Sequence, residues 1–546
     1  MAIQTSKLIS TKKETEEQPI LIQPGQVRVR IAPSPTGFLH IGTARAALFN
    51  YLFAKKYQGI FIIRIEDTDP ERSKPEFEKN ILDSFKWLGM DWDEGPEVEG
   101  EYGPYHQSKR GDIYKKYTNQ LLKEEKAYHC FCSKEDLEAH RQYLLSIGQP
   151  PRYSGKCASL SKKEVEEKLA RGEKSVIRFK VSPKEVEFED LIRGKIKFDA
   201  SLIGDIVIAK DLTSPLYNYA CVIDDVEMKI SHVIRGEDHI PNTPKQILLY
   251  EALNFPVPKF AHLPLILGPD RTKLSKRHGA VSIAQYKKMG YLPEALVNFM
   301  VFLGWNPGTE REIYSIRSLI KEFSLDRVQK GGAIFNIKRL DFLNGFYIRQ
   351  KTLEKLTNLC LPYLIEAGFI KELGGNPGNP EETEKLGLFK EEKATFQIKE
   401  TGEGISFETL TRIIAIYQER LKKLSEILEL TDFFFKEKLN YSKNLLKWRE
   451  MSDKEIGLAL DTLNWSLSKI KEGDWTKENL EKVLLPEAKR FNNKIKKPIE
   501  DRGYLLWPLR VALTGKKASA GPFEIAEILG KEKTLKRIKE ARGLMK

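Results

Sequence analysis

Residues 27–50 read VRVRIAPSPTGFLHIGTARAALFN, and this stretch decides the fold class. An apolar strand pattern comes first, a loop rich in proline and glycine follows, and an apolar-periodic helix begins near His40. Gly59 ends the helix pattern, and a second apolar strand pattern, IFIIRIED, follows at residues 60–67. Strand, helix and strand in this order predict a βαβ unit, which is the repeating element of doubly wound α/β sheets.

Further along the chain, the α/β pattern is interrupted and then resumes. Strand-like runs recur at residues 204–210 (GDIVIAK) and 232–238 (HVIRGED), and the helical run TPKQILLYEAL follows at 243–253. The interval from Tyr105 to Leu202 therefore predicts an inserted domain. From about Tyr347 onward the sequence is rich in lysine and glutamate with helical periodicity, so we expect a mainly α-helical C-terminal half.

The composition is that of a globular protein without a membrane segment. Of 546 residues, 41% are hydrophobic and 31% are charged. No apolar run reaches the roughly eighteen residues of a transmembrane helix, and the polar start of the chain lacks the apolar core of a signal peptide. Five scattered cysteines argue against a disulfide framework, so we expect a cytoplasmic protein. The formal net charge of +13 would attract a polyanion such as nucleic acid, although many basic proteins bind none.

The loop after the first strand has the composition of a phosphate-binding loop. Pro33 and Pro35 stiffen the chain, and Gly37 permits backbone geometries that larger residues resist. A helix that begins near His40 directs unpaired N–H groups and the positive end of its dipole toward the carboxyl edge of the sheet, where phosphates bind. Gly42 would leave room for a nucleotide, and His40 would donate to a phosphate oxygen. Taken alone, HIG is explained more simply by a helix-start histidine and a packing glycine.

A second polar motif, KLSKR at residues 273–277, changes this interpretation. Lys273 and Lys276, with Ser275 between them, suit a mobile clamp on phosphates. By itself, a solvated basic loop explains the motif equally well. Together, the two motifs are specific for a nucleotide-phosphate site.

Three motifs follow one another along the chain: PSPTGFLHIGT at 33–43, RIEDTD at 64–69 and KLSKR at 273–277. In these motifs and their order, the chain resembles the class I aminoacyl-tRNA synthetases. The resemblance is closest to the bacterial glutamyl-tRNA synthetases. The resemblance spans nearly the whole chain and includes LYNYACVIDD at 216–225 and LLWPLRVALTG near the C-terminus. The class signature usually ends in a second histidine where this chain has Thr43, a change that glutamyl enzymes commonly tolerate.

The resemblance implies a Rossmann-type catalytic domain and a two-step reaction. Glutamate and ATP form glutamyl adenylate, and a terminal ribose hydroxyl of the tRNA then takes the glutamyl group. Neither step needs a covalent enzyme intermediate, so catalysis would come from positioning and from stabilisation of charge on the phosphate. The implied catalytic residues, acting with Mg²⁺, are His40, Lys273 and Lys276. The implied ATP-binding residues are Pro33, Gly37, His40, Gly42, Thr43, Lys273, Ser275 and Lys276.

The resemblance also implies a set of glutamate-binding residues. They are Arg30, Ala32, Ser34, Glu66, Tyr217 and Arg235. Arg30 matches the residue that reads the substrate side chain, and a guanidinium group suits this function because it pairs with a carboxylate bidentately. Glu66 matches the residue that holds the substrate ammonium. Structural interpretations stay open for three of these residues. Arg30 could be an arginine on a sheet face, Glu66 could cap a helix, and Tyr217 could be an ordinary core residue.

Cys130, Cys132 and Cys157 resemble the zinc knuckle that some glutamyl enzymes carry in the inserted domain. Those members have a fourth ligand shortly after the third cysteine, whereas this chain reads KCASLSKKE there. Structural zinc takes four protein ligands, so three thiols leave the site incomplete. His129 and His140 are candidate substitutes, and the presence of zinc stays open.

The resemblance divides the chain into six segments. They are a polar N-terminal extension (1–25), the first part of the Rossmann catalytic domain (26–104), an inserted acceptor-binding domain (105–203), the second part of the Rossmann domain (204–268), a stem-contact domain with the KLSKR loop (269–346) and an α-helical anticodon-binding domain (347–546). Within the last segment, residues 371–387 are dense in glycine, proline and acid, and they predict a loop or insertion.

The implied partners are L-glutamate, ATP and tRNA(Glu), and we expect a monomer. Charging of tRNA(Gln) and the identity of the anticodon-reading residues stay open. A glutaminyl-tRNA synthetase typically ends in β-barrels, and a truncated relative that modifies a tRNA base lacks an anticodon domain, so the helical C-terminal half disfavours both. A non-catalytic tRNA-binding paralogue tends to lose its active-site residues. This chain retains them: His40, Lys273, Lys276, Arg30 and Glu66.

Overall fold

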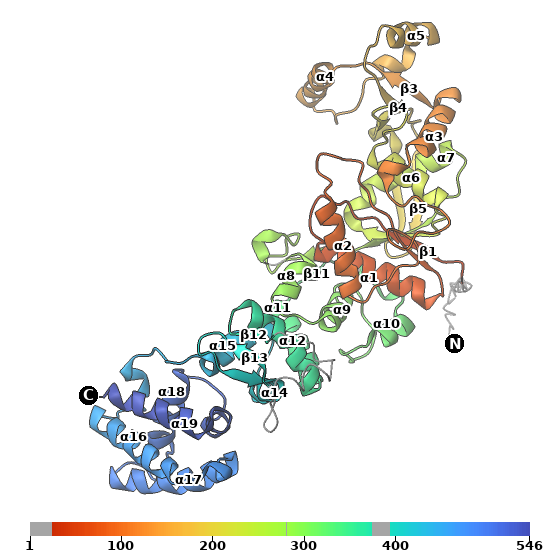
Figure 1. The fold of residues 1–546 in the computed structure, drawn as a ribbon. Helices are drawn as coiled ribbons and strands as arrows, with labels where there is room; N and C mark the ends of the chain where they lie inside the picture. Colours follow the sequence, from red (N-terminus) through yellow and green to blue (C-terminus); the bar gives the residue numbers. More distant parts are fainter. Residues whose placement is uncertain (1–24, 280, 374–393, 546) are drawn as a thin grey trace, which may run out of the picture. The chain divides into compact units, whose positions relative to one another are not determined.

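The computed structural model describes residues 25–279, 281–373 and 394–545 (Figure 1). The chain divides into two compact units, the first comprising Met1–Ala284 and Met300–Phe335 and the second comprising Gln285–Phe299 and Asn336–Lys546. The expected N-terminal extension up to residue 24 and the expected Gly/Pro-rich loop from residue 374 onward lie outside the described residues. Among the described helices, none is both long and apolar enough to cross a membrane.

The expected βαβ unit is present in the first unit. β1 (Arg28–Ile31) and β2 (Ile60–Ile63) pair in parallel, and α1 (Ile41–Lys56) connects them. Val29 on β1 and Phe61 on β2 lie opposite each other, and both are fully buried. Parallel strands are covered on both faces and are therefore almost continuously apolar, which explains why the run IFII forms β2.

A four-stranded sheet extends this arrangement. In spatial order it consists of β6 (Gly194–Asp199), β5 (Glu185–Asp190), β9 (Lys259–Leu263) and β8 (His232–Gly236). β5 and β8 are parallel to β9, and β6 is antiparallel to β5. The Ser231 N–H donates to the Arg28 carbonyl over 2.9 Å, which places β8 beside β1. The carboxyl ends of β1, β2 and β8 thus meet at one edge, where open α/β sheets bind ligands.

Residues 185–199 of the expected inserted segment belong to this four-stranded sheet, whereas other residues of the segment contribute to a separate antiparallel sheet. In spatial order its strands are β3 (Ala127–Cys130), β4 (Val176–Phe179) and β7 (Ile206–Ala209). β7 is the run GDIVIAK, which we expected to resume the parallel sheet. It pairs instead with β4, with Phe179 opposite Ile206. A short apolar run fits either sheet, and its pairing partner is set by contacts with residues distant in sequence.

Helices connect the strands of the first unit. Beyond α1 they are α2 (Pro75–Trp87), α3 (Gly111–Lys123), α4 (Lys134–Ser146), α5 (Lys162–Ala170), α6 (Tyr217–Glu227), α7 (Thr243–Ala252) and α10 (Ile316–Glu322). A buried core of aromatic and aliphatic side chains joins β2, α3, α6 and α7. β10 (Ile266–Leu267) and β11 (Ala333–Ile334) form a short parallel pair. The chain passes from one unit to the other within α8 (Ile283–Lys288) and α9 (Pro293–Val301).

The second unit is mainly helical, as expected. Its helices are α11 (Ile337–Arg349), α12 (Leu353–Glu366), α14 (Phe407–Ala415), α15 (Ile427–Thr431), α16 (Asp453–Ser468), α17 (Lys477–Lys494), α18 (Gly503–Thr514) and α19 (Pro522–Gly543). A small antiparallel sheet accompanies them, formed by β12 (Ile370–Glu372), β13 (Ala394–Ile398) and β14 (Gly404–Ser406). One apolar core extends through these helices, because each presents an apolar stripe to its neighbours.

Candidate active site

A cavity of about 460 Å³ lies in the first unit at the carboxyl ends of β1 and β8 and at the start of α1. Most of the residues assigned to the site from the sequence line it: Arg30, Ala32, Pro33, Ser34, His40, Gly42, Thr43, Glu66, Tyr217, Arg235 and Lys273. Gly37 and Ser275 do not line it, and the side chain of Lys276 lies outside the described part of the structure. The structure thus brings the HIG motif and the first lysine of KLSKR to the same cavity.

Two backbone hydrogen bonds hold the loop that follows β1. The Glu66 N–H donates to the Pro33 carbonyl and the Lys74 N–H donates to the Pro35 carbonyl, each over 3.0 Å. The prolines therefore stiffen the loop and offer their carbonyls to the segment after β2. Gly37 does not have a positive φ, and a Cβ at this position would meet nothing within 4 Å. The expected conformational need for glycine at this position is therefore wrong.

His40 is the N-cap residue of α1 and lines the cavity. Its Nδ1 accepts a hydrogen bond of 3.1 Å from the Gly42 N–H, so a neutral ring carries its proton on Nε2. Burial lowers the pKa of His40, and the nearby charge of Lys273 lowers it further, so the ring is neutral near pH 7. The Nε2–H group is thus the donor that His40 has available. The amides of Ile41 and Gly42 are already bonded, to the Val281 carbonyl and to His40.

Lys273 forms an ion pair with Asp238. Its Nζ donates to Oδ2 of Asp238 over 2.9 Å, and both side chains are exposed at 63% and 47%. Burial raises the pKa of Asp238, but the hydrogen bond and charge of Lys273 and the smaller lowering effects around it together outweigh burial, so the net shift is downward. Such exposed pairs contribute about 0–1 kcal/mol, so a phosphate would displace Asp238 from Lys273 at small cost. The Leu274 N–H donates to the Ile266 carbonyl over 2.9 Å and anchors the KLSKR loop to β10.

Arg30 is 3% exposed and is held by a buried carboxylate. Its Nε and Nη2 donate to Asp225 over 3.0 and 3.1 Å, and Nη1 of Arg64 donates to the same carboxylate over 2.6 Å. Burial would raise the pKa of Asp225, but the two guanidinium groups outweigh it and lower the pKa to about 2. Nη1 of Arg30 makes no hydrogen bond to any described residue. Nη2 also donates to Sγ of Cys221 over 3.7 Å, so Nη1 is the guanidinium nitrogen that remains available to a ligand carboxylate.

Glu66 and Tyr217 place further polar groups on the cavity wall. Oε1 of Glu66 accepts from Nη2 of Arg64 over 3.3 Å; burial raises the pKa of Glu66 more than the two neighbouring arginines lower it. The Tyr217 hydroxyl lies 3.0 Å from Nδ1 of His239. Burial raises the pKa of Tyr217, and burial together with Arg235 lowers the pKa of His239 to about 4. Tyr217 and His239 are therefore neutral near pH 7.

Two protein families match this chain. Residues 26–342 match the tRNA synthetases class I (E and Q), catalytic domain, and residues 356–542 match the anticodon binding domain. The glutamate–tRNA ligase of Carboxydothermus hydrogenoformans is 46% identical over 517 residues, which cover 94% of this chain and 99% of that relative. The chain belongs to the glutamate–tRNA ligase family. Glutamate–tRNA ligase 1 of Caldicellulosiruptor saccharolyticus is 47% identical over 521 residues, with coverage of 94% and 98%.

Solved structures of glutamate–tRNA ligases share the fold. The ligase from Elizabethkingia meningosepticum, in complex with its amino acid, matches with a TM-score of 0.79 at 33% identity and covers 95% of this chain and 100% of its own. The synthetase from Elizabethkingia anophelis matches with a TM-score of 0.77 at 32% identity, with coverage of 95% and 99%. The class I fold and the family expected from the sequence are therefore confirmed.

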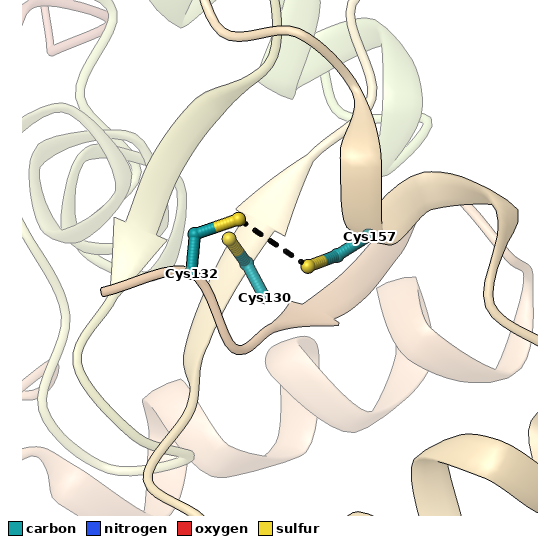
Figure 2. A group of neighbouring side chains, drawn as sticks. All are labelled: Cys130, Cys132 and Cys157. Carbon is teal, nitrogen blue, oxygen red and sulfur yellow. Dashed lines mark hydrogen bonds between the residues drawn. The ribbon is translucent and has the colours of Figure 1, made fainter. Parts of the chain in front are cut away.

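The three cysteines of this glutamate–tRNA ligase family member form one cluster (Figure 2). Cys130 ends β3, Cys132 lies in the loop after it, and Cys157 lies in the short 3₁₀ helix Lys156–Ser159. Their sulfur atoms all lie within 4.8 Å of one another, and those of Cys132 and Cys157 are 3.6 Å apart. Zinc–sulfur bonds of about 2.3 Å in a tetrahedron place sulfur atoms about 3.8 Å apart, so the cluster fits zinc.

Sequence interpretation missed a fourth polar group in this cluster. The Tyr153 hydroxyl lies 3.4 Å from Sγ of Cys130 and 3.3 Å from Sγ of Cys132, and it accepts a hydrogen bond of 3.0 Å from the Cys157 N–H. Nε of Arg178 donates to Sγ of Cys130 over 3.2 Å, and its guanidinium lies over the Tyr153 ring. The signal was present in RYSGKC, where a tyrosine precedes the third cysteine by four residues.

The two histidines considered as substitute ligands lie outside the cysteine cluster. Nδ1 of His129 lies 2.9 Å from the Ser175 hydroxyl, and His140 stacks on Tyr143. Neither ring joins the group of potential metal ligands found among the described residues.

The cavity wall also includes residues to which sequence reasoning gave no function. Arg45, on the buried face of α1, donates to the carbonyls of Leu303 and Pro264, and burial lowers its pKa to about 10. Asp238 and His239 follow the end of β8. Asp225, which holds Arg30, was visible as an acid within the apolar run LYNYACVIDD, a pattern that indicates a buried and therefore paired carboxylate.

Proposed function

We propose that this chain attaches L-glutamate to the 3′-terminal adenosine of tRNA(Glu) by way of glutamyl adenylate. The observation that carries this proposal is the convergence of two residue sets on one cavity. One set, which includes Arg30 and Glu66, suits an amino acid with a carboxylate side chain, and the other, which includes His40 and Lys273, suits phosphates. A single cavity with both sets matches a reaction that joins an amino acid to the α-phosphate of ATP.

Glutamate binding rests on the charges around Arg30. Asp225 fixes the guanidinium from one side, and Nη1 of Arg30 donates to the side-chain carboxylate of the substrate. Glu66 accepts hydrogen bonds from the substrate ammonium, and Tyr217 and Arg235 complete the pocket. Ala32 and Ser34 line the same wall. Glutamine lacks the negative charge that this arrangement requires.

Phosphate binding and catalysis rest on the HIG and KLSKR motifs. The neutral His40 ring donates through Nε2–H to an oxygen of the reacting phosphate, and Lys273 exchanges Asp238 for the negative charge of ATP. Lys276 supplies a second cation, and Gly42 and Thr43 border the nucleotide. Magnesium accompanies ATP and neutralises part of its charge. Because the residues only position groups and stabilise charge, no covalent intermediate forms on the protein.

Aminoacylation by the purified chain tests the reaction. tRNA(Glu) and tRNA(Gln) are each incubated with glutamate or glutamine, with and without ATP. We expect glutamate on tRNA(Glu) and an absolute requirement for ATP; the tRNA(Gln) arm determines the tRNA range. Glutamine on either tRNA, or no charging at all, would overturn the proposal.

A lysine replacement tests the catalytic assignment. Lys276→Ala should reduce ATP–pyrophosphate exchange, measured with tRNA present, by about 10²-fold or more, because one donor to the transition-state charge is lost. Lys210→Ala, at an exposed lysine of the same unit, serves as the matched control and should exchange at the normal rate. Near-normal exchange by Lys276→Ala would remove this residue from the mechanism.

We further propose that Cys130, Cys132, Cys157 and the Tyr153 hydroxyl hold a structural zinc ion. The ion would tie β3 to the helix that carries Cys157 and would take no part in the chemistry. Elemental analysis of purified protein should find one zinc per chain, and Tyr153→Phe should lower the affinity measured by chelator competition. A metal-free protein that keeps full stability would contradict this assignment.

The remaining proposals concern the tRNA, the oligomeric state and the location. We expect the inserted segment (105–203) to contact the acceptor end, residues 269–346 to contact the stem, and the helical segment 347–546 to contact the anticodon. Contacts of lysine and arginine with phosphates should make tRNA affinity fall steeply with salt, and a flat dependence would contradict them. Sedimentation should give a monomer, and fractionation should place it in the cytoplasm.

A further inference from the structure

Arg235 is a cavity residue whose guanidinium is held by neutral groups. It is the fourth residue of β8 and is 6% exposed. Its Nε donates to Nε2 of His262 over 3.2 Å, and its Nη2 donates to Thr243 over 2.9 Å and to Oε1 of Gln246 over 2.7 Å. Its Nη1 is buried and has no hydrogen-bond partner among the described residues. One nitrogen of a cavity-lining arginine is therefore left for a ligand.

His262 contacts Arg235 as a neutral acceptor. The two residues are direct neighbours in the parallel pair of β8 and β9. Because Nε2 of His262 accepts from Arg235, the ring proton must sit on Nδ1, which lies 2.6 Å from Oδ2 of Asp190. Burial lowers the pKa of His262, in spite of the raising effect of Asp190, so the ring is uncharged near pH 7. A protonated ring would lose its acceptor and repel the guanidinium.

Asp190 fixes the tautomer of His262. It is the last residue of β5, and its two oxygens accept from the backbone N–H groups of Ile192, Arg193 and His262 as well as from the ring. All of these partners are hydrogen-bond donors, so both carboxylate oxygens of Asp190 are already hydrogen-bonded. The carboxylate contacts His262 and does not contact Arg235. The imidazole thus stands between the buried acid and the guanidinium.

The consequence is a difference between the two arginines of the glutamate pocket. Arg30 contacts Asp225 directly, so much of its positive charge is neutralised within the protein. Arg235 makes no ion pair with any described residue; the acidic side chain of nearby Glu237 is bonded to Arg193. Arg235 is therefore a buried cation whose charge is not balanced by a contacting carboxylate, an arrangement that is costly unless a ligand supplies the counter-charge.

We propose that Asp190, His262 and Gln246 are positioning residues that hold Arg235 rigid without neutralising it, so that Arg235 binds a carboxylate of the amino acid substrate through Nη1. This inference rests on the proposed function, because it assumes that the cavity binds glutamate. Preorganisation reduces the entropy lost on binding, and the neutral shell keeps the full charge for the ligand.

Gln246→Glu tests the charge argument with almost no change of shape. The new carboxylate keeps the hydrogen bond to Nη2 of Arg235 but forms a direct ion pair with it, at the cost of the donor to Asn218. We expect the KM for glutamate to rise about 10-fold or more while the KM for ATP stays within about 2-fold. Gln329→Glu, an equal change of charge at an exposed position, is the matched control and should leave both values unchanged. A normal glutamate KM in Gln246→Glu would overturn the inference.

A pair of replacements at His262 tests the positioning argument. Glutamine places its amide oxygen near the position of Nε2 and can still accept from Arg235, whereas asparagine is too short and leaves that donor unpaired. We expect His262→Gln to keep the glutamate KM within about 3-fold and His262→Asn to raise it about 10-fold, with thermal melting of each recorded. Equal effects of the two His262 replacements on the glutamate KM would show that His262 has only a structural role and would overturn the positioning argument. If His262→Asn does not fold, the glutamate KM of Gln246→Glu tests the inference instead.

Two further measurements separate this inference from the proposed function. If the wild-type chain does not charge tRNA(Glu) with glutamate, the proposed function is wrong, and the inference that rests on it is wrong as well. If it does, Arg235→Gln should raise the glutamate KM. An effect of Arg235→Gln without an effect of Gln246→Glu would leave the proposed function intact and overturn the positioning shell.

Discussion

Replacement of Asp225 by asparagine is expected to destabilise the first unit and to weaken glutamate binding together. The carboxylate receives three hydrogen bonds from two buried guanidinium groups, at 2.6, 3.0 and 3.1 Å. Asparagine keeps one acceptor oxygen, but its NH₂ group faces an N–H donor of Arg30 or Arg64. Both arginines then remain buried, with the directly contacting charge removed.

The size of the effect follows from the electrostatics of the same contacts. The lowering of the Asp225 pKa to about 2 corresponds to about 2 kcal/mol of favourable interaction. Removing one partner of a buried ion pair costs about 3–5 kcal/mol in total, because the remaining charge stays desolvated. We therefore expect Asp225→Asn to lower the free energy of local unfolding by about 3–5 kcal/mol.

Hydrogen exchange followed by mass spectrometry measures this loss within one unit, which matters because the chain divides into two units. Peptides that cover β1 and α6 should lose protection by about 10²- to 10⁴-fold. Asp83→Asn, which removes an exposed partner of Lys79, makes the same substitution at the surface and should change protection little. If the peptides of Asp225→Asn and Asp83→Asn show the same hydrogen-exchange protection, the buried ion pairs of Asp225 do not hold β1 against α6. The glutamate KM of Asp225→Asn should also rise, because Arg30 loses its fixed orientation.

Two further predictions concern His40 and His232. His40→Asn should keep the N-cap of α1, because the asparagine side chain also accepts a hydrogen bond from the Gly42 N–H. The rate of ATP–pyrophosphate exchange should nevertheless fall about 10²-fold, because no Nε2–H donor remains. Exchange at the normal rate with an unchanged melting temperature would contradict the donor role of His40. Burial lowers the pKa of His232 to about 4, below the value of about 6.5 in an unfolded chain. The unfolded chain therefore binds a proton at this residue more readily than the folded chain does. The folded state keeps its full stability above pH 6.5 and loses stability as the pH falls from 6.5 toward 4. The melting temperature of wild type should therefore fall over this range more steeply than that of His232→Phe, and parallel curves would show that His232 does not contribute.

Local sequence patterns predicted the elements that carry the site. The apolar runs around HIG predicted β1, α1 and β2, because burial on both faces of a parallel sheet demands such runs. The order and spacing of HIG, RIEDTD and KLSKR identified the family. The helical period of the C-terminal half predicted the second unit.

Contacts between distant residues were beyond these patterns. The sheet that accepts β7, the binding of Arg30 to Asp225 and the closing of the cysteine cluster by Tyr153 each depend on which groups meet after folding. A carboxylate such as Asp190 is only an acid in the sequence, and burial next to His262 makes it a positioning residue. The sequence by itself therefore determined the elements, the motifs and the family, which follow from local period and composition. The tertiary structure alone decided which charges are paired and which are left for a ligand, because the energy of a buried charge depends on its neighbours in space.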